Sequence, residues 1–75
     1  MAEIPEELKK LASIATDLKL PAELRTRAIE HLGVTSTHDA LLALLELAAN
    51  ESLITKERDL ALKKAREVVK RTSPS

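Results

Sequence analysis

The chain contains no cysteine, phenylalanine, tyrosine or tryptophan, and only one of its 75 residues is glycine. Without cysteine it can form neither a disulfide bond nor a zinc site built on thiolates. A single glycine cannot build a glycine-rich phosphate-binding loop. Without Phe, Tyr or Trp, the core must be made of Leu, Ile, Val and Ala, which suits closely packed helices, and nucleic-acid bases have no large aromatic ring on which to stack.

What remains is a globular composition, with 44% hydrophobic and 32% charged residues. The net charge is zero, which disfavours general nucleic-acid binding. The charge is unevenly spread, because residues 1–54 hold five basic and nine acidic residues whereas residues 55–75 hold seven basic and three acidic. No signal peptide is visible, and no apolar run approaches the ~20 residues that span a bilayer. We therefore expect a single cytoplasmic domain over residues 1–75 that does not act at a membrane.

Apolar residues at helical spacing predict four helices, over residues 5–18, 21–32, 37–50 and 56–71. The third contains HDALLALLELAAN and is apolar on nearly all sides, so we expect it to be the buried central helix. Pro5 and Pro21 suit the first turns of the first two helices. The short connections favour an all-α fold of two stacked antiparallel hairpins.

Two local signals mark the boundary between the second and third helices. Gly33 follows the last apolar residue of the second helix, which is the favoured place for a glycine with positive φ that ends a helix. With ordinary helical dihedrals at Gly33, we would expect the second and third helices to form one longer rod, and the repeat interpretation would then fail. Ser36 and Asp39 resemble a capping box at the start of the third helix.

Sliding the chain against itself by 33 residues aligns the first two predicted helices with the last two. Apolar positions keep their phase in this alignment, and periods of such length indicate stacked helical hairpins. The alignment also matches identical residues at six positions: Leu8 with Leu41, Leu11 with Leu44, Ala15 with Ala48, Leu20 with Leu53, Arg25 with Arg58, and Ala28 with Ala61.

The segment PAELRTRAIEHLG resembles the second half of a HEAT-type repeat, in the short form found in the phycobilin lyase group. The residues that carry this resemblance are Arg25, Ala28, Leu32 and Gly33, and part of the pattern returns as Arg58 and Ala61. The resemblance covers about residues 5–69. It implies a fragment of a right-handed α-α superhelix, or a small bundle, that serves as an interaction scaffold.

The family pattern carries no catalytic residue onto this chain, and its arginine position is mainly structural. Two departures stand out. Arg66 occupies the place in the second copy that Gly33 occupies in the first, so we expect the fourth helix to continue there. Two repeats are also fewer than the three or more that such folds usually need.

The side chains of this sequence provide neither a convincing catalytic triad nor enough ligands for a metal site. Ser36, His38 and Asp39 include the residue types of a hydrolase triad, but they are too close together at a helix start to form a relay, so we assign them to capping. His31 and His38 are the only soft metal ligands, and a catalytic zinc site needs three protein ligands. We predict no enzyme activity, no metal and no cofactor.

The last predicted helix has a basic face. Lys56, Lys63 and Lys70 recur every seven residues, with Arg66 nearby. Such a stripe is a candidate contact for phosphate or for an acidic partner. A solvated helix face is the simpler interpretation, because two acidic residues interrupt the stripe.

A second candidate surface is apolar, because the third helix offers more apolar surface than three short helices cover. We expect an exposed patch that serves self-association or a partner, with the members Leu42, Leu45, Leu53 and Ile54. In the alternative, the first and fourth helices close over the third, and Leu53 and Ile54 plug the remaining gap.

These surfaces predict a non-enzymatic protein–protein interaction module, a small adaptor or a regulatory subunit. One alternative is a nucleic-acid-associated protein that uses the basic face of the last helix, with Lys63, Arg66 and Lys70 as contacts. The other alternative is an obligate homodimer. The sequence names no individual partner.

Overall fold

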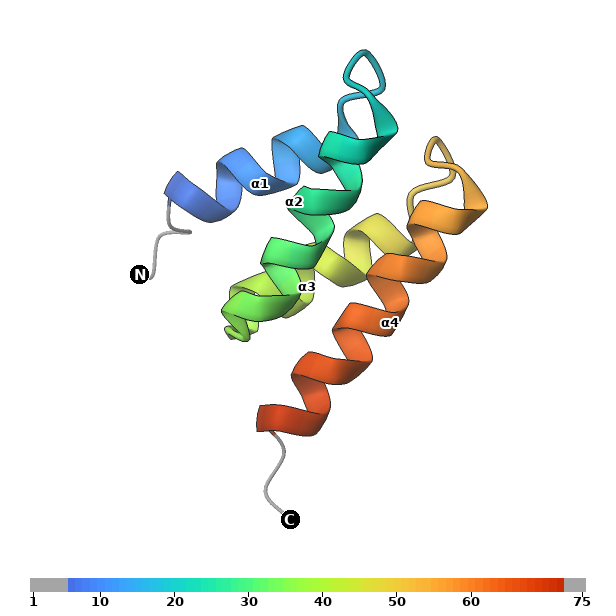
Figure 1. Ribbon diagram of the computed structural model, residues 1–75. Coiled ribbons are helices and arrows are strands. Elements are labelled where there is room, and N and C mark those ends of the chain that lie inside the picture. The colour runs from blue at the N-terminus through green and yellow to red at the C-terminus, as the bar shows by residue number, and fades with distance from the viewer. Residues whose placement is uncertain (1–5, 73–75) are drawn as a thin grey trace.

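The computed structural model describes residues 6–72, and within them the chain forms four α-helices and no strand. The helices are α1 (Glu6–Thr16), α2 (Ala22–Thr35), α3 (His38–Ala48) and α4 (Thr55–Thr72) (Figure 1). The predicted all-α fold of four helices is confirmed. Pro21 directly precedes α2, and its carbonyl accepts hydrogen bonds from the first turn. The predicted role of Pro5 lies outside the described residues.

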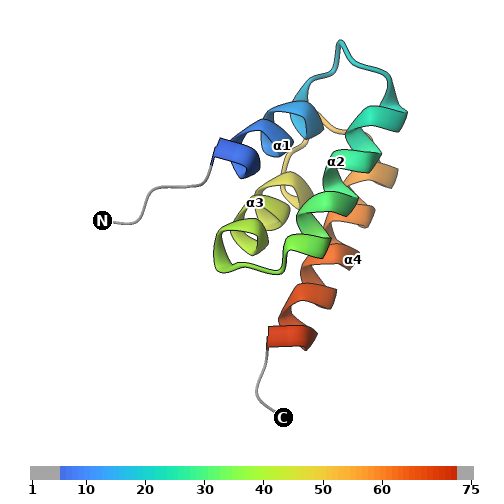
Figure 2. The same ribbon diagram turned by 60° about the vertical axis from the view of Figure 1, so that its left-hand side comes forward.

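The helices form two layers. α1 and α2 pack together as a first hairpin, and α3 and α4 pack together as a second. α1 lies beside α3 in one layer, and α2 lies beside α4 in the other, running in the same direction (Figures 1 and 2). The core between the layers is aliphatic, and its fully buried larger side chains are Ile29, Leu32, Leu44 and Val68.

α2 and α3 each pack on all three other helices, so the prediction that the other segments pack on α3 is confirmed. The prediction that α3 is buried on nearly all sides is wrong, because Leu42 and Leu45 are about half exposed. The physical reason is that a two-layer packing covers only one side of α3. Its outer side meets no other part of the described chain, however apolar its sequence.

The predicted positive φ at Gly33 is also wrong. α2 continues through Gly33 to Thr35, and the chain reverses at Ser36, which has a left-handed φ of 54°. The helices do not merge into one rod, because Thr37 caps α3 by accepting a hydrogen bond from the Ala40 N–H at 3.1 Å. The N-cap is therefore Thr37, and the capping box predicted from Ser36 does not form.

Gly33 is instead required by helix packing. A Cβ atom at Gly33 would lie 2.9 Å from Cδ and 3.1 Å from Cβ of Lys64 on α4. The missing side chain thus lets the middle of α4 approach the C-terminal end of α2.

The turns within the two hairpins use the same hydrogen bonds. In each turn, a side-chain oxygen of Asp or Asn accepts a hydrogen bond from the main-chain N–H two residues later, at 2.9 Å. The main-chain carbonyl of the same residue accepts a hydrogen bond from the N–H three residues later, at 3.1 Å. The residues are Asp17, Lys19 and Leu20 in the first turn, and Asn50, Ser52 and Leu53 in the second. An offset of 33 residues therefore relates hydrogen bonds as well as apolar positions.

Candidate binding groove and the ion pair behind it

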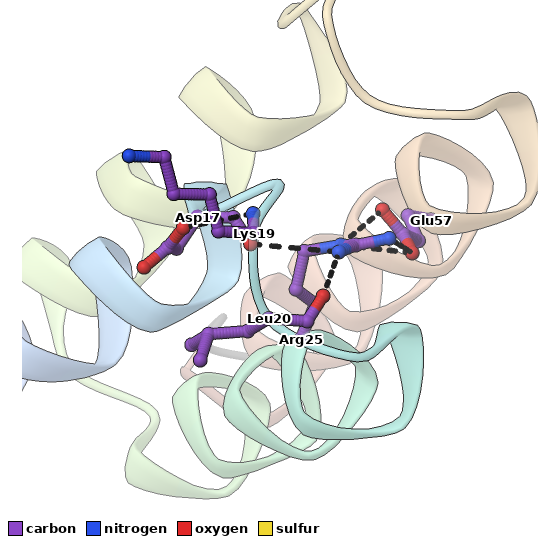
Figure 3. A network of polar contacts seen from close by, with 5 residues as sticks. All are labelled: Asp17, Lys19, Leu20, Arg25 and Glu57. Atoms are coloured by element: carbon purple, nitrogen blue, oxygen red, sulfur yellow. Dashed lines mark hydrogen bonds and ion pairs between the residues drawn. The ribbon is translucent and has the colours of Figure 1, made fainter.

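A buried ion pair joins the two hairpins. The guanidinium of Arg25 on α2 donates from Nη2 to Glu57 Oε2 at 2.9 Å, and from Nε to both carboxylate oxygens at 3.0 and 3.1 Å. Only 9% of the Arg25 side chain and 3% of the Glu57 side chain is exposed. Figure 3 shows the two side chains meeting between α2 and α4. This two-pronged geometry fixes the position of α4 against α2.

Arg25 also holds the turn that precedes it. Its Nη1 donates to the Leu20 carbonyl at 2.6 Å and, less closely, to the Asp17 carbonyl at 3.4 Å (Figure 3). The carboxylate of Glu57 lies in the first turn of α4, where the helix dipole favours negative charge. No buried side-chain nitrogen or oxygen in residues 6–72 lacks a hydrogen-bond partner. The pair is therefore a satisfied structural contact, and it leaves no free group for catalysis.

The environment of Arg25 favours its charged form. The hydrogen bonds with Glu57 raise the pKa of Arg25 above its usual value; burial opposes this, and the charges of Glu57 and Asp17 add to it. A raised pKa means that the stabilisation from this charge is complete at neutral pH. It is lost only when the pH rises through that raised pKa.

A second arginine repeats part of this arrangement. Arg58 follows Arg25 by 33 residues, and its Nε donates to the Ala48 carbonyl at the end of α3 at 3.2 Å. Arg58 is only partly buried. Its guanidinium makes no ion pair with any described residue. It therefore lacks the carboxylate that Arg25 finds in Glu57.

An open apolar groove lies between α3 and α4, which we call the α3/α4 groove. Its apolar lining consists of Leu41 and Leu45 from α3, and Leu62, Ala65 and Val69 from α4. Its remaining lining residues are Arg66 and Lys70, so its rim carries positive charge and no carboxylate. The arrangement can accept an apolar surface that has negative charge at its edge.

The structure brings three of the predicted contact residues together, since Leu45, Arg66 and Lys70 all line the α3/α4 groove. Lys63 lines a different depression, between α2 and α4. Lys63 and Lys70 therefore do not serve one groove. This weakens the case for a continuous basic face.

The predicted apolar patch is divided. Leu42 lines a depression between α1 and α3, and Ile54 is exposed in the turn before α4. Leu53 is only 4% exposed, so its assignment to an exposed patch is wrong. The alternative, in which Leu53 plugs the gap between helices, describes this residue correctly but not Ile54.

Sequence reasoning missed two parts of the site. Apolar spacing alone does not show that Leu62 and Val69 line the groove, where they are 39% and 48% exposed. Glu57 was not singled out at all. A signal for it existed, because Arg25 lies in phase with the apolar residues of α2, and a buried guanidinium needs a carboxylate.

The histidines lie apart from the groove. His31 and His38 are both exposed; His31 lies one turn before the end of α2, and His38 is the first residue of α3. Among residues 6–72, no group of three or more His, Cys, Asp or Glu side chains is placed to hold a metal ion.

Comparison of the chain with protein-family models, curated proteins and solved structures finds no match. In the part of the chain that the structure describes, no helix is both long enough and apolar enough to cross a membrane.

Proposed function

We propose that this chain is a non-enzymatic, HEAT-like interaction module that works in the cytoplasm and binds a helix of a protein partner in the α3/α4 groove. The observation that carries the proposal is the groove, with an apolar lining from two helices and Arg66 and Lys70 at its rim. Grooves between helices are common docking places for amphipathic helices. The repeated hydrogen bonds of the two turns support the repeat interpretation.

A protein partner fits the charge distribution better than nucleic acid does. The cations at the groove stand beside an apolar surface, and Lys63 lies in another depression. Phosphate backbones are bound by many cations along one path, and this chain carries no net positive charge.

The proposal can be tested by selecting helical peptides that bind the purified chain from a display library of 18-residue amphipathic helices. Leu62→Asp places a charge in the groove, at a residue that is 39% exposed. Its matched control is Leu24→Asp, because Leu24 is 42% exposed and lies in the depression between α1 and α2.

We expect peptides that bind the wild-type chain and the Leu24→Asp variant alike, and that bind the Leu62→Asp variant at least about tenfold more weakly. Both variants should keep the circular dichroism of the wild type, since both sites are partly exposed. If Leu24→Asp weakens peptide binding and Leu62→Asp does not, the binding site lies on the other hairpin. If no peptide depends on Leu62, the proposed function is wrong.

A further inference from the structure

We propose that the helix bound in the α3/α4 groove is acidic, with a carboxylate in its first turn that pairs with Arg58 as Glu57 pairs with Arg25. This inference rests on the proposed function and specifies the chemistry of the partner. It follows from comparing the outer face of α4 with the face of α2 that α4 covers.

One line of residues on α2 faces α4. Arg25 pairs with Glu57, and Gly33 lies against Lys64. Ile29 lies midway between these two on the same side of the helix, because residues four apart are neighbours on a helix surface. Ile29 is completely buried. The three residues therefore form the surface of α2 on which α4 packs.

The corresponding line on α4 is Arg58, Leu62 and Arg66, each 33 residues further on. Each is more exposed than its counterpart, and Leu62 and Arg66 line the open groove. No helix of the described chain covers this line, although it continues the same pattern of one arginine followed by an aliphatic residue. The groove thus corresponds to a face that, in the first hairpin, receives a helix.

The two arginines differ in their partners. Arg25 meets two main-chain carbonyls and a carboxylate, whereas among residues 6–72 Arg58 meets the Ala48 carbonyl alone. Arg58 lies outside the groove lining but four residues before Leu62 on the same side of α4, so a helix that covers Leu62 and extends one turn toward the start of α4 also removes water from Arg58. Burying an unpaired guanidinium is unfavourable, so a suitable partner must bring a carboxylate to that end of the groove. Glu57 shows where in a helix such a group fits, since it lies in the first turn of α4.

A second copy of this chain is a poor occupant. If its first hairpin stacked on the groove as the second hairpin stacks on the first, Leu24 would stand where Glu57 stands, and Arg58 would meet no carboxylate. Arg66 occupies the position equivalent to Gly33, so any helix in the groove lies further from α4 at that end than α4 lies from α2. A partner with carboxylates along its edge supplies the group that Arg58 needs and can form ion pairs with Arg66 and Lys70.

The test uses the helical peptides selected on the purified chain. We expect Glu or Asp to be enriched in the first turn of the groove-dependent peptides. For one such peptide, replacing that acidic residue by its amide should weaken binding about tenfold, and Arg58→Gln should weaken the unmodified peptide by a similar factor. The amide peptide should respond little to Arg58→Gln, because both changes remove the same contact.

Arg66→Gln provides a second variant, because Arg66 is exposed and the change should leave the fold intact. The matched control is Arg27→Gln, at an exposed arginine beside the depression between α1 and α2. Binding should weaken in Arg66→Gln and with added salt, and should not change in Arg27→Gln. Groove-dependent peptides without acidic preference, unaffected by Arg58→Gln and Arg66→Gln, would overturn the inference and leave the proposed function standing. If the binding of no peptide depends on Leu62, both this inference and the proposed function are wrong.

Discussion

Arg25 lies on the same side of α2 as Ile29 and Leu32, so burial of that side also buries a guanidinium. Removing such a group from water is costly unless its donors are satisfied. The fold meets this need twice, with the carboxylate of Glu57 and with the Leu20 carbonyl. The Arg25 side chain thereby joins α2 to α4 and to the turn between α1 and α2.

The ion pair gives a prediction for stability. Glu57→Ala should lower the free energy of unfolding by ~3–5 kcal/mol, because it leaves a buried cation without its partner. The matched control is Glu23→Ala, which breaks the exposed pair between Glu23 and Arg27 and should change the free energy by no more than ~0.5 kcal/mol. Urea denaturation followed by circular dichroism measures both. Equal, small effects would show that the buried pair contributes no more than a surface one.

Ser36 adopts a backbone conformation that suits glycine better than serine. Its φ of 54° is left-handed, which costs an L-residue ~1–2 kcal/mol. Ser36→Gly should therefore raise the free energy of unfolding by about 0.5–1 kcal/mol. Two effects reduce this gain: the variant loses the long hydrogen bond from the Ser36 hydroxyl to the Gly33 carbonyl, and glycine gives the unfolded chain more conformational freedom. Thr35→Gly, at the last residue of α2, should lower it. Chemical denaturation of the two variants distinguishes the directions.

At the scale of the helices, arginines from one element complete the end of another. α1, α2 and α3 have no basic residue in their own last turns. Arg25 donates to the carbonyls after α1, Arg58 to the last carbonyl of α3, and Arg71 of α4 to the Gly33 carbonyl near the end of α2. These contacts satisfy carbonyls that a helix cannot satisfy itself, and they place positive charge where the helix dipole favours it.

The two sides of α3 should respond very differently to truncation. Leu44 is fully buried in the core, and Leu44→Ala should lower the free energy of unfolding by ~2–5 kcal/mol. A small domain has only ~3–5 kcal/mol from its core, so this variant could unfold. Leu45 is its neighbour and is 44% exposed, so Leu45→Ala should change stability by no more than ~0.5 kcal/mol. An unchanged denaturation midpoint for Leu44→Ala would contradict the assigned core.

The contact between α2 and α4 predicts a penalty for Gly33→Ala. A methyl group there meets the Lys64 side chain at 2.9 Å, and the 3.1 Å contact with Lys64 Cβ cannot be relieved without moving the helix. Overpacking costs ~1–3 kcal/mol, whereas alanine gains ~1 kcal/mol over glycine in a helix. We expect a net loss of about 1 kcal/mol in the free energy of unfolding. The loss should shrink when Gly33→Ala is made in a Lys64→Ala chain, and a stabilised Gly33→Ala protein would show that α4 gives way.

The sequence predicts the order of the helices well, because apolar spacing and proline positions are local signals. It predicts less well which sides of each helix are covered by other helices. HDALLALLELAAN is apolar on nearly all sides, and nothing within it distinguishes the buried Leu44 from the exposed Leu45. The role of Gly33 depends on Lys64, and the partner of Arg25 is 32 residues away, so neither could be inferred from neighbouring residues.

At the scale of the whole molecule, the two hairpins leave different outer faces. Beside α1 and α2 lies a depression lined by residues that include Leu24, Arg27 and His31. Beside α3 and α4 lies the groove with Arg66 and Lys70. The buried pair of Arg25 and Glu57 lies between these faces and holds the hairpins together. The two faces can therefore bind different surfaces, and of these two it is the α3/α4 groove that combines an open apolar lining with two cations and no carboxylate.

This charge arrangement predicts how self-association depends on salt. Two copies that met groove to groove would bring Arg66 and Lys70 of one copy near those of the other, and the like charges would repel. At about 0.05 M salt we expect sedimentation velocity to give the monomer mass of 8.2 kDa across micromolar concentrations. At about 1 M salt the repulsion is screened within about 3 Å, and any apolar association through Leu45 and Leu62 should increase.

Binding of an acidic helix should have the opposite salt dependence, because screening removes attraction instead of repulsion. The same protein would then lose its partner and gain self-association as salt rises. The Arg66→Gln variant should reduce both trends, since it removes one of the charges responsible. A stable dimer at low salt that resists dilution would favour the obligate homodimer and would contradict the assignment of the groove to an acidic partner.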